Sequence, residues 1–285
     1  MRRSLCFAIC LMSSCALLVL PGASWSQNFI YPPAPTIEVV ENYHGTHIAD
    51  PYRWMEDESS PELKAWIEAE LWNYPRFSPP RKKGNTYFTS KNEGLQNQSV
   101  VYAQTQLGGA SRIVIDPNTL SNDGTIAISG MAFSDDGTLL AYGLSRSGSD
   151  WQEIRIRDLR TGKDFDEVIR FCKFAGVAWT KDKRGFYYNR YPDPSTVPAG
   201  EQSYNNKVYW HTLGTPQAED RLVYERPDAR ELGFSPSLSE DGRYLVLTVW
   251  HGSSPKNRIY YRRADSQGDF LRLLDEADAS YDFLG

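Results

Sequence analysis

A short phrase recurs three times in this chain, and it constrains the fold more than any other feature. Each copy has an apolar residue, a hydroxyl residue and acidic residues near a glycine, and β-forming residues follow. The copies lie at residues 133–137, 179–185 and 238–242. Their hydroxyl residues, Ser134, Thr180 and Ser239, are 46 and 59 positions apart. A loose period of about 50 residues is typical of one β-propeller blade per repeat.

Short β-forming runs separated by glycine, asparagine and aspartate divide the chain after residue 84 into four expected blades. Their strands are expected at 100–103 and 113–115; at 126–128, 139–142, 154–157 and 168–169; between 177 and about 224; and between 238 and 274. Alternating apolar and charged residues favour strands with one face in water. Propellers close with about four to eight four-stranded blades. We therefore predict a mainly β chain that holds part of a propeller.

The composition suits a folded protein and argues against one class of partner. Hydrophobic residues make up 40% of the chain, and the net charge is −5. Short basic patches such as residues 81–83 are too small to form the positive surface that nucleic acids require. We expect no nucleic-acid partner. The acidic pair Asp135-Asp136 is interpreted as a turn whose side chains bond nearby backbone amides.

The first 26 residues differ in character from the rest. Two arginines precede an apolar run over residues 5–20, and a Pro-Gly pair and three small residues follow before Gln27. This order is typical of a signal peptide, and the run is too short for a membrane span. We expect export to the periplasm or the medium, with no membrane attachment after cleavage. Only Cys172 follows this segment, so an internal disulfide is not expected.

One helix is expected before the β-rich part. Ser60 is placed to cap it, with Pro61 at the first helical position. Leu63, Trp66 and Ile67 recur at helical spacing on one face. The proline-rich residues 74–80 are predicted to end the helix and to form a linker.

Residues 43–57, YHGTHIADPYRWMED, resemble the N-terminal signature of the prolyl oligopeptidase family of serine peptidases. Similar segments follow in the family's order at 94–98, 116–121, 142–151, 174–180 and 239–244. The resemblance implies a seven-bladed propeller that covers an α/β-hydrolase domain and excludes folded proteins. That domain carries a Ser/Asp/His triad and cleaves short proline-containing peptides after proline. The resemblance implies no cofactor.

The chain departs from this family pattern in two places. It holds about half of the family's propeller, and residues 71–74 pass from helix to blade with fewer residues than usual. We expect a signal peptide at 1–26, an N-terminal arm with one helix at 27–80 that packs on the hydrolase domain, and a partial propeller at 84–285. Without that domain the chain is expected to be truncated and inactive alone. The alternative function is that of an exported, non-catalytic propeller scaffold. The chain is alternatively a gene-model fragment of a full enzyme. The alternative location is the cytoplasm.

The sequence offers no convincing catalytic or metal site. A nucleophile elbow requires Gly-x-Ser-x-Gly, and the segments at 143–147 and 233–237 both lack the final glycine. The four histidines, His44, His47, His211 and His251, do not match the family's catalytic position. His44, His47 and Asp50 are not expected to lie on a helix that would bring their side chains together around zinc. We predict no catalytic residue and no metal ligand.

Three residues are candidates for substrate binding by resemblance. Asp150 and Phe174 match family positions that face the cavity between the domains, with Phe174 near the substrate's side chains. Ser253, in the loop 252–255, matches another cavity-facing position. The alternative for Phe174 is an ordinary place in the core of a blade.

Overall fold

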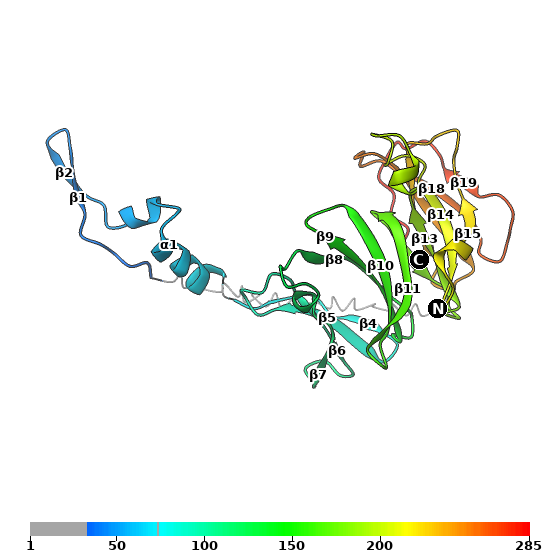
Figure 1. Cartoon of the computed structure of the whole chain (residues 1–285), viewed down its shortest axis with the longest axis horizontal. Helices are drawn as coiled ribbons and strands as arrows, with labels where there is room; N and C mark the ends of the chain where they lie inside the picture. Colours follow the sequence, from blue (N-terminus) through cyan, green and yellow to red (C-terminus); the bar gives the residue numbers. More distant parts are fainter. Residues whose placement is uncertain (1–32, 73) are drawn as a thin grey trace, which may run out of the picture. The chain divides into compact units, whose positions relative to one another are not determined.

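The computed structural model describes residues 33–72 and 74–285, in two compact units, residues up to Ala65 and residues from Trp66 onward (Figure 1). The signal peptide predicted for residues 1–26 lies outside the described residues. Within the described ranges, no helix is both long and apolar enough to cross a membrane.

The first unit contains one hairpin and most of one helix. Strands β1 (Val40–Tyr43) and β2 (Thr46–Ala49) pair antiparallel, and a 3-10 turn at Arg53–Glu56 follows. Helix α1 (Pro61–Trp66) begins where predicted, because the Ser60 hydroxyl accepts the Leu63 amide at 3.2 Å. A π-helical segment, Ile67–Trp72, continues α1 in the second unit.

The second unit is built from four antiparallel sheets (Figure 1), and in the second, third and fourth of them neighbouring strands are consecutive in the chain. The first sheet contains β3 (Arg76–Phe77), β4 (Arg81–Lys83), β5 (Thr86–Asn92), β6 (Val100–Gln104) and β7 (Ser111–Ile115). The second contains β8 (Ile126–Phe133), β9 (Leu139–Arg146), β10 (Trp151–Asp158) and β11 (Lys163–Lys173).

The third sheet contains β12 (Val177–Trp179), β13 (Gly185–Arg190), β14 (Lys207–Thr212) and β15 (Arg221–Tyr224). The fourth contains β16 (Leu232–Leu238), β17 (Tyr244–His251), β18 (Arg258–Arg263) and β19 (Leu271–Leu274). This confirms the predicted mainly β, blade-like architecture. The first sheet starts at Arg76, inside the stretch predicted as a linker, because β3 and β4 both pair with β5.

The three repeated phrases form equivalent hairpins between the first two strands of the second, third and fourth sheets. In each, the hydroxyl donates to the aspartate two residues later at 2.7 Å; the pairs are Ser134–Asp136, Thr180–Asp182 and Ser239–Asp241. The residue three positions after the hydroxyl residue has a positive φ in each copy: Gly137 at 69°, Lys183 at 57° and Gly242 at 73°. The predicted bond to a backbone amide is confirmed for Asp136, whose carboxylate accepts the Thr138 amide, but Asp135 accepts from two lysine side chains instead.

Ion pairs join neighbouring hairpins. Asp135 bonds Lys83 of the first sheet at 3.1 Å and also pairs with Lys181 of the third. Asp136 pairs with Lys183. Lys183 occupies the position that glycine holds in the other two copies. Its positive φ is uncommon for lysine, and the ion pair with Asp136 is formed in that conformation.

Apolar side chains fill the space between successive sheets. The core between the second and third sheets contains Leu139, Ala141, Ile154, Ile156, Ile169, Cys172, Trp179, Phe186 and Tyr188. The core between the third and fourth contains Val208, Leu232, Phe234, Leu247, Val249 and Tyr260. Burial raises the pKa of the free Cys172 thiol. Packing face to face around such cores is how propeller blades are stabilised.

Candidate functional site

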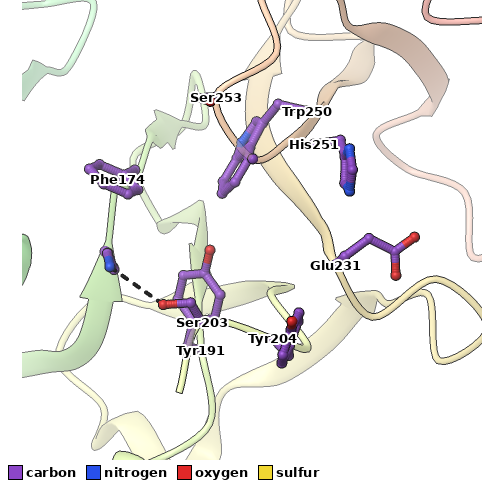
Figure 2. A pocket seen from close by; sticks show the side chains of 10 residues that line it. Phe174, Tyr191, Ser203, Tyr204, Glu231, Trp250, His251 and Ser253 are labelled. Atoms are coloured by element: carbon purple, nitrogen blue, oxygen red, sulfur yellow. Dashed lines mark hydrogen bonds between the residues drawn. The ribbon is translucent and has the colours of Figure 1, made fainter. Parts of the chain in front are cut away.

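A cavity of about 670 Å³ opens where β11 and β17 end (Figure 2). It is lined by Lys173, Phe174, Tyr191, Ser203, Tyr204, Glu231, Trp250, His251, Gly252 and Ser253. These residues come from the ends of strands and the loops after them in the second, third and fourth sheets. Loops positioned by a rigid sheet are the usual place for binding residues.

Phe174 reaches this cavity because the end of β11 is irregular. The β10–β11 register shifts between the pairs Gln152–Cys172 and Ile154–Ile169. Phe171 has φ 62° and Phe174 has φ 51°, in a region where a bulky side chain is strained. Such strain often accompanies function. The bulge directs Phe174 out of the sheet, and its side chain is 57% exposed. Phe174 is therefore not part of a blade core.

Aromatic side chains form much of the cavity wall, as Figure 2 shows for Phe174, Tyr191, Tyr204 and Trp250. The rings of Phe174 and Trp250 meet edge to face, with centroids 6.5 Å apart. Tyr191 is buried, and burial raises its pKa to about 12. A wall of this kind suits flat, apolar groups, since aromatic rings offer large contact areas with few rotatable bonds.

Lys173 supplies a positive charge at the edge of the aromatic wall. Its Nζ lies 3.4 Å from an Asp150 carboxylate oxygen and 3.4 Å from the Ser203 hydroxyl. The same Nζ lies 5.3 Å from the centre of the Phe174 ring, a cation–π distance. The Lys173 side chain is 19% exposed, so its charge is fixed in position yet partly open to the cavity.

The structure places the three predicted substrate-binding residues in one region. Phe174 and Ser253 both line the cavity. Asp150 is not a lining residue, but it contacts the cavity through its ion pair with Lys173. The sequence reasoning missed Trp250, which is the second last residue of β17 and could have been found from its place at the strand end nearest to loop 252–255.

The described residues hold no arrangement for nucleophilic catalysis. Ser145 and Ser235, the centres of the two incomplete elbow motifs, lie within strands β9 and β16 rather than at a strand-to-helix turn. No serine hydroxyl in residues 33–72 and 74–285 bonds a histidine ring. His211 is fully buried and contacts Asp220 at 2.7 Å, away from the cavity. Across the same ranges no cluster of three or more His, Cys, Asp and Glu could hold a metal.

The four sheets and the cavity at their loop ends are those of part of a β-propeller. The family model for the prolyl oligopeptidase N-terminal β-propeller domain matches residues 32–70 and 69–284. The chain therefore belongs to the prolyl oligopeptidase family. The two matched segments meet at residues 69–70.

Curated relatives agree with this assignment. The chain is 33% identical to the prolyl endopeptidase of Elizabethkingia meningoseptica over 275 residues, which covers 88% of this chain and 38% of that protein. It is 33% identical to prolyl oligopeptidase A of Galerina marginata over 320 residues, with 91% and 43% covered. The chain thus spans about two fifths of the length of these relatives.

Solved structures are similar over the same part. One, from a study of two prolyl endopeptidases and their inter-domain dynamics, has a TM-score of 0.67 and 31% identity, covering 89% of this chain and 40% of that one. Another, prolyl oligopeptidase B of Galerina marginata bound to a 35mer substrate, has a TM-score of 0.67 and 27% identity, covering 89% and 42%.

Proposed function

We propose that this chain forms the propeller wall of the substrate chamber in a prolyl oligopeptidase-like serine endopeptidase. In this proposal the chain binds short proline-containing peptides, and an α/β-hydrolase domain carries out the cleavage. The observation that carries the proposal is the exposed Phe174, held at positive φ and packed edge to face against Trp250 in the wall of a cavity of about 670 Å³. The names of the relatives, prolyl endopeptidase and prolyl oligopeptidase, support the substrate class.

The lining explains how a peptide would be held. A proline ring or an apolar side chain would lie against Phe174 and Trp250, because burying apolar area there stabilises the complex by about 25 cal/mol per Å². Lys173 would bond a peptide carbonyl or carboxylate with its ammonium N–H groups. Asp150 would keep the ammonium at the cavity edge through the 3.4 Å pair. Binding and orientation, rather than bond breaking, are the roles of these residues.

A chimera tests the proposal. Residues 33–285 would replace the matching region of the Elizabethkingia meningoseptica prolyl endopeptidase, and kcat/KM would be measured on a two-residue Gly-Pro reporter and on a longer peptide with apolar residues before Gly-Pro. Phe174→Ala is expected to lower kcat/KM at least tenfold on the longer peptide and little on the short one, while Phe77→Ala, an exposed control, changes neither. Equal kcat/KM of the Phe174→Ala and unsubstituted chimeras on the longer peptide would contradict the proposal.

We extend the proposal to the rest of the chain. Residues 27–80 would pack on the hydrolase domain, and exposed apolar side chains such as Val40 and Tyr43, 61% and 66% exposed, suit such a contact. Residues 1–26 would direct export, on the strength of their charged, apolar and small-residue order. Expressing the chain in a bacterial host and sequencing the N-terminus of the exported product tests the second point: a start at Gln27 supports it, and an intact, retained chain contradicts it.

A further inference from the structure

A second cavity, of about 560 Å³, lies at the opposite end of β17 from the Phe174 cavity. Gly242, just before β17, lines this second cavity, whereas His251, the last residue of β17, lines the first. Its wall comes from the repeated hairpins and from the strand ends of the third and fourth sheets. Tyr187, Trp210, Arg221 and Ala264 are among its lining residues.

Arg262 does not line this cavity, but it is a buried cation next to its wall and has no anionic partner. Its guanidinium lies over Phe270, which packs in the same apolar cluster as the lining residues Tyr187 and Ala264. The residue is only 9% exposed, and its Nε has no hydrogen-bond partner. One guanidinium nitrogen donates to the Gly268 carbonyl oxygen at 3.0 Å, and the group lies 4.6 Å from the centre of the Phe270 ring. Within the described ranges, Arg262 forms no ion pair. A buried charge without a counter-charge is costly, so this arrangement calls for an anion.

Arg221 brings a second positive charge to the same place. It lines the cavity and donates to the Gln267 side-chain oxygen at 2.6 Å, and no carboxylate in the described residues pairs with it. Burial lowers the pKa of Arg262, and the charge of Arg221 lowers it further. Both guanidinium groups also act on the pKa of Tyr187, which burial raises and they lower. Gln267 and Gly268, to which Arg221 and Arg262 donate, are consecutive residues, so the two guanidinium groups lie close to the same loop.

The carboxylates around the cavity are already engaged by other cations. Asp182 pairs with Arg184 at 2.5 Å, Asp241 with Arg243 at 2.5 Å, and Asp265 with Arg263 at 2.8 Å. Lys181, a further cation of the wall, pairs with Asp135. Lys181 shares Asp135 with Lys83, whereas Arg221 and Arg262 form no ion pair with any carboxylate of the described residues.

We propose that Arg221 and Arg262 bind a tetrahedral oxyanion, such as phosphate or sulfate, in this second cavity. Guanidinium groups present paired N–H donors that match the oxygen spacing of such anions. The Tyr187 hydroxyl is an additional donor, since its present bond to the Ala264 carbonyl oxygen is long, at 3.4 Å. The anion would neutralise the positive charge of the two arginines between the third and fourth sheets, at the end of β17 opposite the Phe174 cavity.

Thermal unfolding of the full chain tests the proposal. Sodium phosphate is titrated against sodium chloride of equal ionic strength. At phosphate about tenfold above its Kd, the unfolding midpoint is expected to rise by ~3–5 °C relative to chloride, and the rise should saturate. Arg262→Met and Arg221→Gln should abolish or greatly reduce it. Arg263→Met, on the same strand and paired outward with Asp265, should keep it.

The outcomes separate specific binding from the general stabilising effect of phosphate, which does not saturate and would persist in every variant. No saturable difference between phosphate and chloride in the unsubstituted chain overturns the proposal, as does an unchanged response in Arg221→Gln. If Arg262→Met does not fold, Arg221→Gln decides alone. In chloride, a folded Arg262→Met chain should be at least as stable as the unsubstituted one, because it lacks the unpaired buried charge.

Discussion

Replacing Ser134 by alanine tests the role of the repeated phrase in holding the fold. Ser134 is fully buried, and its hydroxyl oxygen accepts the Leu139 amide at 2.9 Å while its O–H donates to Asp136 at 2.7 Å. Leu139 is itself only 6% exposed, so its amide would lose its acceptor where water cannot easily replace it. An unsatisfied buried donor costs about 1–3 kcal/mol and a bond to a charged group contributes about 1.5–3 kcal/mol.

Since the two losses share one side chain and do not add fully, we expect Ser134→Ala to lower the free energy of unfolding by about 2–4 kcal/mol. The assay is urea unfolding followed by tryptophan fluorescence and far-ultraviolet circular dichroism, with linear extrapolation to water. Ser111→Ala, at an exposed site in β7, is the matched control and should change the value by less than about 0.5 kcal/mol. A Ser134→Ala loss no larger than the control's would refute the reasoning.

Three further predictions concern charge, the cavity and the core. Hydrogen bonds from Ser239 and Arg243 lower the pKa of Asp241 from 3.8 to about 2. The charge of Asp241 therefore stabilises the fold above the usual carboxyl pKa, and this contribution is lost as the pH falls toward 2. In urea midpoints measured from pH 7 to pH 2, the Asp241→Asn chain should lose less stability than the unsubstituted chain. Gly233→Ala would place a Cβ 2.0 Å from a Trp250 ring carbon, so the ring should move and the tryptophan emission should shift. Leu247→Ala, at a fully buried site, should cost about 2–5 kcal/mol in urea unfolding.

Matched variants make these predictions decisive. Asp282→Asn, an exposed control, should keep the full acid sensitivity, and an Asp241→Asn profile parallel to the unsubstituted one would contradict the charge argument. Gly130→Ala, where nothing lies within 4 Å of the added carbon, should leave the emission unchanged; an equal lack of effect in Gly233→Ala would show that Trp250 is not constrained there. Leu273→Ala, at a side chain that is 58% exposed, should cost little, and a similar small cost at Leu247 would contradict the assigned core.

The repeated hairpins could be predicted because their hydroxyl and aspartate side chains form the turn within a few residues, so the signal is local. The helix start at Ser60 was predictable for the same reason. The cavity was only partly predictable, since it joins residues from 173 to 253 that three sheets bring together. Phe174 was identified by resemblance, but its positive φ could not be read from the sequence, because nothing about a phenylalanine indicates that conformation.

Peptide binding by the purified chain tests the central claim most directly. The chain would be titrated by isothermal calorimetry with a short apolar peptide containing one proline, with the same peptide carrying alanine instead, and with the Phe174→Ala variant in a parallel series. We predict saturable binding of the proline peptide, weaker binding of the alanine peptide, and at least tenfold weaker binding by Phe174→Ala. No binding by the folded chain, or equal affinity of the chain and its Phe174→Ala variant, would contradict the assignment of this cavity to the substrate.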